Sequence, residues 1–334
     1  MAKWKVVLTD RQFNSIDDER AILEAIGAEL LDYQIQDEDS LIKLFKEVNP
    51  DAVIMQYANL SRRVIESMPN CQIIAKYAIG LDRIDIPAAT ENNVCVSNVR
   101  DYCIDEVSTH TVALILAITR KITVLNRETK LGNWSYKNMG SVRNLRGLTL
   151  GLNSFGKIAQ LVAEKMAPYG INIIAYDPFV PADVAAAKGI KLVSFDELVE
   201  QSDILSTHVP DMDGTRGMFN KSVFKRMKNT SYLINTGRGP VVNELDLIEA
   251  LKSGEIAGAA LDVTDPEPIQ PDNPLCSMNN VIITPHAAYY SDDSEKTLKI
   301  LTAENVAQRL QGYAPRFLAN PELKEKLSLK TLTE

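Results

Sequence analysis

The stretch Leu148–Asp177, LTLGLNSFGKIAQLVAEKMAPYGINIIAYD, decides the fold of this chain. It is typical of an apolar strand, a tight turn, a helix with apolar residues at helical spacing, and a second strand that ends on an acid. Gly156 in the turn allows the backbone to approach a pyrophosphate, at which the first amides of the helix point. Asp177 follows about 20 residues later, where a carboxylate binds the ribose hydroxyls of an adenosine. The stretch predicts a mononucleotide-binding βαβ unit.

The glycine pattern of the turn is incomplete. In a G-x-G-x-x-G register, Ser154 takes the first place, Gly156 the second and Ala159 the third. The remaining glycine is the one whose backbone comes nearest the ligand, and serine and alanine are small enough for the other two places. On this stretch alone, a plain strand-turn-helix is an equally good interpretation. The choice between the two depends on the residues downstream.

Length and composition narrow the class of protein. A chain of 334 residues predicts two domains. With 45% hydrophobic and 24% charged residues it is typical of a globular protein, and 36 basic against 44 acidic residues predict no nucleic-acid partner. The N-terminus lacks a signal sequence and no run is long enough to span a membrane, so we expect a cytoplasmic protein with no membrane partner. The four cysteines lack metal-ligand spacing, so no metal site is expected.

Strands and helices alternate along the chain, which favours parallel sheets with helices on both faces. Residues 105–126 contain neither glycine nor proline and predict one long helix between domains. The predicted strands are residues 5–8, 29–33, 52–56, 73–77, 94–96, 148–152, 171–176, 203–208, 231–235, 257–263 and 281–284. The predicted helices are residues 17–26, 40–48, 61–68, 86–92, 105–126, 158–166, 222–227, 244–253 and 291–311. We therefore expect an α/β chain with a flavodoxin-like substrate domain (1–100 plus 291–334) and a Rossmann nucleotide-binding domain (101–290).

Three polar residues follow strands at the edge where ligands of open α/β sheets collect. Arg238 lies in the turn TGRG, Glu267 lies between two prolines, and His286 follows the strand VIIT. Taken alone, Arg238 is a solvated turn arginine and Glu267 an exposed loop residue. The chain has three histidines, and His110 falls inside the long helix while His208 ends a different strand. Only His286 combines a strand end with potential arginine and glutamate partners.

This trio fits hydride transfer to a 2-oxo acid. A guanidinium matches the planar geometry of a carboxylate and polarises the adjacent carbonyl. An imidazolium donates the proton that the forming alkoxide needs. A carboxylate bonded to the other ring nitrogen orients the imidazole and favours its charged form. A nicotinamide cofactor would supply the hydride.

Six segments together resemble the D-isomer-specific 2-hydroxyacid dehydrogenases. They are AKYAIGLDRIDI, VRDYCIDEVSTHTVALIL, LTLGLNSFGKIAQ, DILSTHVPDMDGTRGMFNKSVFKRMKNTSYLINTGRGPVVNELDLIEAL, AGAALDVTDPEP and NVIITPHAAYYSDDS. The segments occur in the order of that family and cover nearly the whole chain. The HAAYYS and DYC-x-DEV motifs are most similar to the branch of the C-terminal binding proteins and phosphoglycerate dehydrogenase-like enzymes.

The resemblance implies a role for each matching position. Arg238, Glu267 and His286 match the substrate-binding arginine, the orienting glutamate and the acid/base histidine of the family. The positions that match cofactor-binding residues are Ser154, Gly156, Lys157, Ile158, Asp177, His208, Val209, Pro210, Thr215, Thr236, Gly237 and Asp262. Asp262 matches the aspartate that holds the nicotinamide carboxamide. The positions that match substrate-binding residues are Lys76, Ile79, Gly80, Arg238 and Tyr289.

Several positions depart from the pattern of the family. Lys76 aligns with an arginine and Tyr289 with a tryptophan of the C-terminal binding proteins; Lys76 lacks the arginine fork, and it hints at a second anionic group on the substrate. Thr109 stands where many relatives have an acid, and Gly237 replaces an alanine. Asp177 would repel the 2′-phosphate of NADP and no arginine follows it closely, so NAD is the expected cofactor.

The sequence therefore predicts an NAD-dependent D-2-hydroxyacid dehydrogenase that interconverts a small 2-oxo acid and its D-2-hydroxy acid. Glyoxylate, hydroxypyruvate, 3-phosphoglycerate and bulkier 2-oxo acids are all candidate substrates. The resemblance also implies a homodimer. One alternative is an NAD(H)-sensing interaction protein of the C-terminal binding protein type, because that branch keeps the same trio. A Rossmann methyltransferase is a weaker alternative, because it gives the trio no role.

Overall fold

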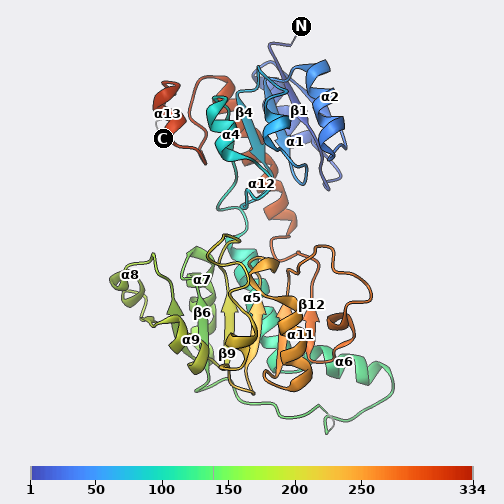
Figure 1. Cartoon of the computed structure of the whole chain (residues 1–334), viewed down its shortest axis with the longest axis vertical. Coiled ribbons are helices and arrows are strands. Elements are labelled where there is room, and N and C mark those ends of the chain that lie inside the picture. Colours follow the sequence, from blue (N-terminus) through green and yellow to red (C-terminus); the bar gives the residue numbers. More distant parts are fainter. Residues whose placement is uncertain (1, 138, 333–334) are drawn as a thin grey trace. The chain divides into compact units, whose positions relative to one another are not determined.

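The computed structural model describes residues 2–137 and 139–332, which form two compact units (Figure 1). One unit comprises residues 1–102 and 291–334, and the other comprises residues 103–290. The expected domain limits had been placed at 100/101 and 290/291. Residues 1, 138, 333 and 334, which belong to the predicted domains and to the loop before the nucleotide unit, lie outside the described residues.

The first unit contains a five-stranded parallel sheet with the order β2-β1-β3-β4-β5. Its strands are β1 (Trp4–Leu8), β2 (Ala28–Asp32), β3 (Ala52–Met55), β4 (Ile73–Lys76) and β5 (Cys95–Ser97). Its helices are α1 (Asp17–Ala25), α2 (Glu38–Val48), α3 (Arg62–Ile65), α4 (Ile86–Glu91), α12 (Asp292–Leu310) and α13 (Glu322–Lys326). This is the predicted flavodoxin-like order, in which ligands bind at the carboxyl edge of the sheet.

Alternate side chains of each strand in this unit enter different cores. Val6 and Leu8 of β1 pack with residues of α1 and α12, whereas Val7 packs with residues of α2, α3 and α4 on the other face. Successive side chains of a strand point to opposite faces of the sheet, so Val6 and Leu8 lie on one face and Val7 on the other. Both faces of the sheet are therefore buried, as the near-continuous apolar runs of a parallel sheet require.

The second unit contains a seven-stranded parallel sheet with the order β12-β11-β10-β9-β6-β7-β8. Its strands are β6 (Thr149–Asn153), β7 (Asn172–Tyr176), β8 (Lys191–Leu192), β9 (Ile204–Thr207), β10 (Tyr232–Asn235), β11 (Gly258–Leu261) and β12 (Val281–Ile283). Its α-helices are α5 (Ile104–Thr119), α6 (Ile122–Lys130), α7 (Lys157–Met166), α8 (Ala182–Ala186), α9 (Phe195–Gln201), α10 (Lys221–Phe224) and α11 (Glu244–Ser253). Three short 3₁₀ turns are η1 (Ala167–Tyr169), η2 (Gly239–Val241) and η3 (Pro274–Ser277). The strand order reverses between β6 and β9, which is where doubly wound sheets bind nucleotides.

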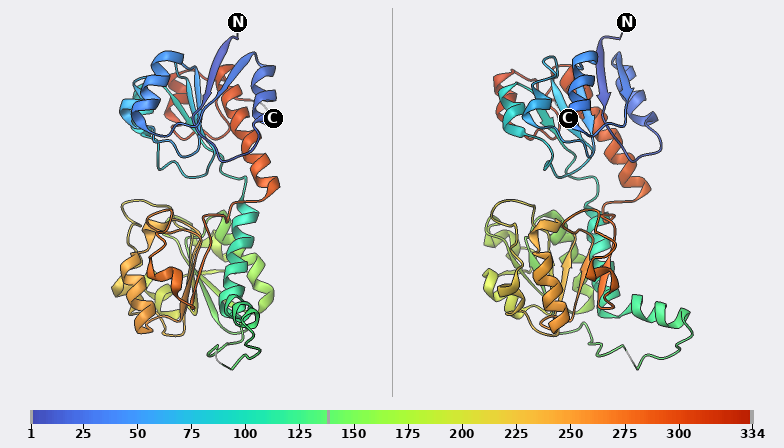
Figure 2. Two further views of the ribbon diagram at one scale, coloured as in Figure 1. Left: turned by 90° about the vertical axis from the view of Figure 1, so that its right-hand side faces the viewer. Right: turned by 45° about the vertical axis from the view of Figure 1, so that its right-hand side comes forward.

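Helices cover both faces of the seven-stranded sheet, as the left view of Figure 2 shows. Residues of α5 and α7 form one core with alternate strand residues, and residues of α9, α10 and α11 form the other. Gly151 in β6 permits close packing on the second face, because a Cβ there would overlap the Ser202 side chain at the end of α9. The predicted fold class, two parallel sheets with helices on both faces, is confirmed.

The prediction of one helix over residues 105–126 was wrong. The segment forms α5 and α6, which meet at an angle of 61°. Between them Lys121 has a positive φ of 56°, a conformation that costs a non-glycine residue about 1 kcal/mol. The Lys121 Nζ atom lies 5.3 Å from the centroid of the Tyr232 ring, and such a contact returns about 0.5–1 kcal/mol. This contact is tertiary, so the local sequence carries no signal of the break.

The prediction also omitted several short elements, namely β8, α8, α9 and α13. A readable signal existed for α9, because Ser194 and Glu197 form a capping box at its start. The S-x-x-E spacing before an apolar pair is the sequence signature of such a cap. The other omitted elements are only two to five residues long.

Within the described residues, no single helix is long and apolar enough to span a membrane. Only α5 and α6 taken together reach the required length, and they are sharply bent. Leu114, Ile115 and Ile118 of α5 are buried in the core of the second unit, so α5 is a core helix of this unit.

Candidate active site

The predicted trio lies on three loops that follow neighbouring strands of the second unit. Arg238 follows β10, Glu267 follows β11 and His286 follows β12, and these three strands are adjacent in the sheet. Gly239 lets the first two loops touch, because a Cβ at this position would overlap the Thr264 carbonyl. Because the three strands are parallel, all three residues lie at the same edge of the sheet.

His286 and Glu267 form a hydrogen-bonded pair. The His286 Nδ1 atom lies 2.9 Å from Glu267 Oε2, and the two side chains are 44% and 41% exposed. The Thr264 amide donates to the other oxygen of Glu267 at 3.3 Å. An ionised Glu267 accepts only, so Nδ1 carries the hydrogen and Nε2 remains for a reacting group.

The pKa of Glu267 lies below its usual value despite partial burial. Burial of the carboxyl group acts to raise the pKa, but the hydrogen bond and the charge of His286 outweigh it. The Thr264 amide and the charge of Arg238 lower the pKa of Glu267 further. The carboxylate of Glu267 is therefore held in its ionised, hydrogen-bond-accepting form beside the imidazole.

Asp262 organises the loop that carries His286. Its side chain is 2% exposed, and its Oδ1 atom accepts from the Thr284 hydroxyl at 2.5 Å and from the Ala287 amide at 2.9 Å. Its Oδ2 atom accepts from the Ala288 amide at 2.9 Å, and its backbone carbonyl accepts from the His286 amide at 2.8 Å. The resemblance had implied only a cofactor contact for Asp262. The structure adds a second task, because the carboxylate holds the His286 loop, whose φ at His286 is +52°.

His110 belongs to the same network, which the sequence did not reveal. Its Nε2 atom lies 3.0 Å from the Thr284 hydroxyl oxygen and 3.6 Å from Asp262 Oδ1. Thr284 has one hydroxyl hydrogen and donates it to Asp262, so Thr284 accepts from Nε2–H of His110. His110 is thus a donor at the end of a short chain of hydrogen bonds that reaches Asp262 through Thr284, whereas His286 is hydrogen-bonded to a carboxylate directly.

Buried polar groups also fix the turn that carries Arg238. Asn235 is fully buried, its side-chain oxygen accepts from the Gly237 amide at 3.0 Å, and its side-chain nitrogen donates to the Arg238 carbonyl at 3.0 Å. The hydroxyls of Thr236 and Thr111 are 2.9 Å apart, and Thr111 donates to the backbone of α5; Thr236 is therefore the donor of that pair. The sequence analysis missed Asn235, although an amide at the end of the apolar strand SYLIN is a usable signal.

The turn between β6 and α7 fits a pyrophosphate. Gly156 is the residue before the first turn of α7, and a Cβ built on it would have Ser154 Oγ, at 3.8 Å, as its nearest neighbour. The packing of the chain itself does not require a glycine there, whereas the close approach of a ligand would. Lys157 and Ile158 occupy the first two places of α7, where helix amides lack intrahelical acceptors. Ser154 has a positive φ of 85°, which explains why this place usually holds glycine.

Asp177 already has several donors within its own unit. Its Oδ2 atom accepts from the Phe155 amide at 2.8 Å and the Ser154 hydroxyl at 3.2 Å. Its Oδ1 atom accepts from the amides of Phe179 and Val180 at 2.9 and 3.2 Å. A carboxylate offers about four acceptor sites. Ribose hydroxyls at Asp177 must therefore replace the longer of these bonds.

The loop after β9 contains the remaining predicted cofactor contacts. The His208 ring contacts the Ser206 hydroxyl at 3.0 Å, and burial of the ring lowers the pKa of His208 to about 4. A neutral imidazole at pH 7 has no proton to give as an acid, so His208 suits a cofactor contact better than proton donation. The Thr215 hydroxyl donates to the Pro210 carbonyl at 2.5 Å and so closes the turn that directly follows Val209.

Three of the predicted substrate residues belong to the first unit. Lys76 ends β4 and is 5% exposed, and Ile79 and Gly80 lie in the turn that follows. The Ile79 carbonyl accepts from the Asn98 side chain at 2.6 Å. The amides of Ile79 and Gly80 have no acceptor among residues 2–137 and 139–332. Such consecutive free amides attract an anion.

Tyr289, the other predicted substrate residue, packs edge-on against His286. Their ring centroids are 6.5 Å apart, with an interplanar angle of 77°. The edge of a tyrosine ring therefore borders the imidazole, and Tyr289 is placed to limit the space beside it.

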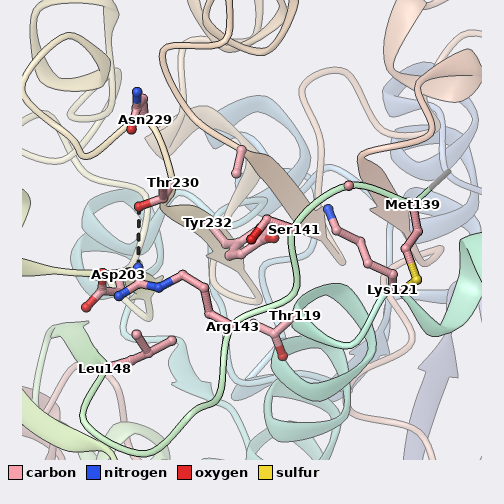
Figure 3. Close-up of a pocket in the computed structure, with 12 residues that line it drawn as sticks. Thr119, Lys121, Met139, Ser141, Arg143, Leu148, Asp203, Asn229, Thr230 and Tyr232 are labelled. Carbon is pink, nitrogen blue, oxygen red and sulfur yellow. Dashed lines mark hydrogen bonds and ion pairs between the residues drawn. The ribbon is translucent and has the colours of Figure 1, made fainter. Parts of the chain in front are cut away.

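A separate cavity of about 200 Å³ lies at the opposite edge of the seven-stranded sheet (Figure 3). Its lining includes Asp203 and Tyr232, at the starts of β9 and β10, so it is at the amino ends of the strands. The Arg143 guanidinium pairs with Asp203 at 2.7 Å in its wall. None of the predicted site residues lines this cavity.

Within the part of the chain that the structure describes, no group of three or more His, Cys, Asp or Glu side chains is placed to hold a metal ion.

Comparison with known proteins assigns the second unit. Residues 112–288 match the family model of the D-isomer specific 2-hydroxyacid dehydrogenase, NAD binding domain. This match covers the βαβ turn and all three residues of the trio. The prediction of NAD as the cofactor is confirmed by it.

Full-length comparisons extend the likeness to both units. The D-3-phosphoglycerate dehydrogenase of Archaeoglobus fulgidus is 34% identical over 309 residues, which cover 90% of this chain, and this chain spans only 58% of that protein. The glyoxylate reductase of Thermofilum pendens is 35% identical over 295 residues, or 86% of this chain and 83% of that protein. The D-lactate dehydrogenase of Aquifex aeolicus, solved with NAD and lactic acid, superposes with a TM-score of 0.81 at 28% identity, over 92% of this chain and 96% of that chain.

These relatives are phosphoglycerate dehydrogenases, glyoxylate reductases and lactate dehydrogenases, so the comparisons do not support placement with the C-terminal binding proteins. The predicted enzyme class is confirmed by the family model and by the relatives. On this sequence, fold and site, the chain belongs to the D-isomer-specific 2-hydroxyacid dehydrogenase family.

Proposed function

We propose that this chain uses NADH to reduce a small 2-oxo acid to its D-2-hydroxy acid, and catalyses the reverse reaction with NAD⁺. The observation that supports this most directly is the 2.9 Å pair of His286 Nδ1 and Glu267 Oε2 within the NAD-binding domain. The bound nicotinamide supplies or accepts the hydride. The residues of the chain supply the proton, the orientation and the charge.

His286 acts as the acid in reduction. Its Nε2–H donates a proton to the oxygen of the 2-oxo group as that oxygen gains negative charge, and takes a proton from the hydroxyl in the reverse direction. Glu267 holds the ring and stabilises its cationic form. Arg238 binds the carboxylate of the substrate and polarises the carbonyl, for which its planar guanidinium is suited. Asp262 keeps the His286 loop in place through three hydrogen bonds to its side chain.

The cofactor contacts follow from the residues at the switch point of the sheet. The amide end of α7, beginning at Gly156, receives the pyrophosphate, and Asp177 receives the ribose. The turns 208–210 and 236–237, with Thr215, border the nicotinamide half, and Asp262 is proposed to contact the carboxamide as well. The negative charge of Asp177 favours NAD over NADP.

The proposed substrates are compact 2-oxo acids of the glyoxylate, hydroxypyruvate and 3-phosphoglycerate types. Supporting this class, the named relatives include glyoxylate reductases and phosphoglycerate dehydrogenases. In the first unit, Lys76, Ile79 and Gly80 are proposed to bind anionic groups of the substrate, and Tyr289 to limit its size. Replacing Lys76 with alanine tests for a second anionic group, because it should weaken turnover of diacids more than of monoacids.

We also propose that the chain forms a homodimer through its nucleotide-binding unit. Helix α6 has no buried residue, and the loop after it exposes Leu131, Trp134 and Tyr136 by 69%, 89% and 73%. Apolar side chains so exposed on one projecting segment favour a protein contact. Light scattering of the wild type and of a Trp134→Ser/Tyr136→Ser variant tests this, since the variant should have the molar mass of a monomer.

We expect the protein in the cytoplasm, which cell fractionation can check.

The deciding experiment follows NADH oxidation by absorbance against a panel of 2-oxo acids, with His286→Ala beside the wild type. Turnover by the wild type that the variant loses supports the proposal and identifies the substrate class. Chiral analysis of the product must give the D-isomer. Tight NADH binding without turnover of any 2-oxo acid would instead support an NAD(H)-sensing protein.

A further inference from the structure

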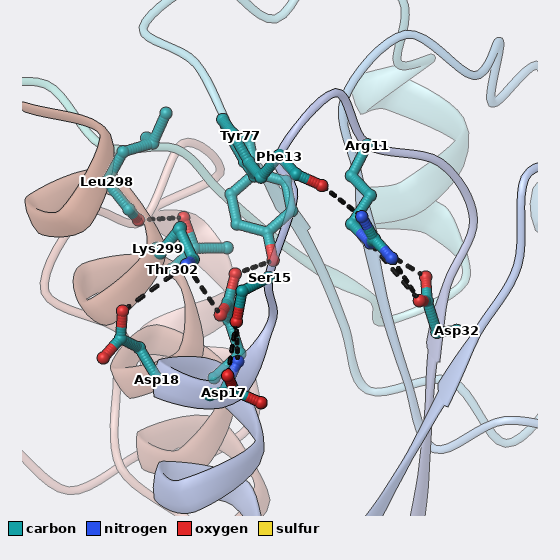
Figure 4. A network of polar contacts seen from close by, with 11 residues as sticks. Arg11, Phe13, Ser15, Asp17, Asp18, Asp32, Tyr77, Leu298, Lys299 and Thr302 are labelled. Carbon is teal, nitrogen blue, oxygen red and sulfur yellow. Dashed lines mark hydrogen bonds and ion pairs between the residues drawn. The ribbon is translucent and has the colours of Figure 1, made fainter. Parts of the chain in front are cut away.

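A buried ionic network lies in the first unit, far in sequence from the catalytic trio (Figure 4). Glu19 of α1 is fully buried, and its Oε1 atom accepts from the Tyr77 hydroxyl at 2.7 Å. The Lys299 ammonium of α12, 6% exposed, lies 3.8 Å from Glu19 Oε2 and 3.4 Å from Asp18 Oδ2. Burial raises the pKa of Glu19 above its usual value, against the opposing effects of Tyr77 and Lys299. The network therefore holds a carboxyl group in an environment that disfavours its charge.

Stability alone does not explain this carboxyl group. Burying a charge costs several kcal/mol even after relaxation, whereas a hydrogen bond to a charged group returns only about 1.5–3 kcal/mol. Glu19 Oε2 has no hydrogen-bond partner among the described residues. The surroundings are apolar, since the Tyr77 ring packs edge-on against Phe13 with centroids 5.1 Å apart. Apolar side chains at positions 19 and 77 together would remove the buried hydrogen bond without leaving either of its groups unpaired, and Lys299 would keep Asp18.

The network holds one end of the predicted anion-binding turn. The Tyr77 amide makes the last bond of the β4 ladder, to the Met55 carbonyl at 2.9 Å. The next residues leave the sheet, and the amides of Ile79 and Gly80 have no acceptor in the described residues. The Tyr77 side chain is thus an anchor directly before the free amides. A shift of this anchor would move the amides with it.

A second buried link reaches the same turn from the same helix. The Asn98 side chain donates to the Ile79 carbonyl at 2.6 Å, and the Asn305 side chain of α12 donates to the Asn98 carbonyl at 3.3 Å. Asn305 is 1% exposed, and its side-chain oxygen has no partner among the described residues. Lys299 and Asn305 both belong to α12 (Asp292–Leu310), the first helix after the chain re-enters this unit at Ser291. Helix α12 therefore holds the turn at both Tyr77 and Ile79.

We infer that Glu19 and Asn305 are positioning residues for the substrate: acting through Tyr77 and Asn98, they fix the turn Tyr77–Gly80 so that its free amides bind the substrate carboxylate. This inference rests on the proposed function, because it assigns the turn to a 2-oxo acid. Neither residue touches the reacting atoms. Their effect is on the geometry of binding, which even a displacement of about 1 Å impairs strongly.

The sharpest test replaces both partners of the buried bond by apolar groups. A Tyr77→Phe/Glu19→Leu variant leaves no unpaired group from that bond and leaves Asp18 as the carboxylate partner of Lys299, so it should fold, and its melting temperature is measured beside its kinetics. If the bond positions the turn, the variant should nevertheless raise the KM of the 2-oxo acid about tenfold, with the KM of NADH unchanged. Asn305→Ala should raise the KM of the 2-oxo acid in the same way.

The control is Tyr33→Phe, which removes a hydroxyl from the same unit for which the described residues show no hydrogen bond. It should change neither KM. A double variant with wild-type stability and a wild-type KM for the 2-oxo acid would overturn the inference, because it would show that the bond serves the core only. An equal rise in the KM of NADH would overturn it too.

A binding measurement separates this inference from the proposed function. Oxamate, a 2-oxo acid mimic, is titrated into NADH-loaded protein by calorimetry. If the wild type binds oxamate but reduces no 2-oxo acid, and the double variant binds it about tenfold more weakly, the inference stands and the proposed function fails. If the wild type binds no oxamate, the turn is no carboxylate site and the inference fails.

Discussion

Strands β9 and β12 are each followed by a histidine at the carboxyl edge of the same sheet, but the two side chains differ in character. His286, after β12, contacts the Glu267 carboxylate at 2.9 Å and is 44% exposed. The ring of His208, after β9, contacts the Ser206 hydroxyl at 3.0 Å, and burial lowers the pKa of His208 to about 4. A carboxylate stabilises imidazolium, whereas burial beside a hydroxyl favours neutral imidazole. The comparison teaches that the surroundings of a histidine, a carboxylate for His286 and burial for His208, decide more than its place after a strand whether it can donate a proton.

The largest expected difference is in catalysis. We expect His286→Asn to lower kcat for reduction of a 2-oxo acid about 1,000-fold, because the general acid is lost. His208→Asn should lower kcat less than about tenfold and act mainly on the KM of NADH. Steady-state kinetics of both variants, with NADH binding followed by fluorescence, measure the contrast. Equal losses of kcat in the two variants would contradict the assignment of the acid to His286.

The next largest effect comes from removing the partner of His286. Glu267→Gln should lower kcat about 100-fold, because the ring loses its orientation and its charged form loses a stabilising carboxylate. Steady-state kinetics of Glu267→Gln beside the wild type measure this loss. A wild-type kcat in Glu267→Gln would show that Glu267 does not position the acid.

His208 should affect stability in acid rather than catalysis. Its pKa is about 4 in the folded chain against 6.5 for an ordinary histidine, so the unfolded chain binds the extra proton first. The stability that neutral His208 contributes is therefore complete above about pH 6.5 and is lost as pH falls toward 4. The full shift corresponds to about 3 kcal/mol, and about 2 kcal/mol is expected because the residue keeps some exposure. Urea unfolding at pH 7 and at pH 4.5 measures this loss. The free energy of unfolding should fall less between these two pH values in His208→Gln than in the wild type.

The contrast between these histidines also shows which features of the fold and the site could be predicted from the sequence. The trio, the βαβ turn and the fold class were accessible, because strand ends, apolar periodicity and the order of six motifs are local signals. The tie of His110 to Asp262 through Thr284 was not, because its members are 174 and 22 residues apart in the chain. The break at Lys121 was hidden for the same reason, since its ring contact is with Tyr232.

Asp262 shows a second limit. Its position after an apolar strand, together with family resemblance, implied a cofactor contact, but nothing in the sequence showed that its oxygens hold the Ala287 and Ala288 amides. Which backbone amide faces which carboxylate depends on the conformation of the loop. The φ of +52° at His286 could not be predicted from the sequence, because a histidine seldom adopts a positive φ. The positions of the site residues could therefore be predicted from the sequence better than the contacts that support them.

The smallest effect tests the cause of the His208 shift. Ser206 is fully buried, and its hydroxyl is the recorded partner of the His208 ring. Ser206→Ala should lower the free energy of unfolding by about 1 kcal/mol, because one ring nitrogen loses a hydrogen bond. That loss should be the same at pH 7 and pH 4.5, since burial rather than the hydroxyl lowers the pKa of His208. If Ser206→Ala instead removes the extra loss of stability in acid, the hydroxyl keeps the ring neutral. The difference between His208 and His286 would then rest on a hydroxyl against a carboxylate, and not on burial.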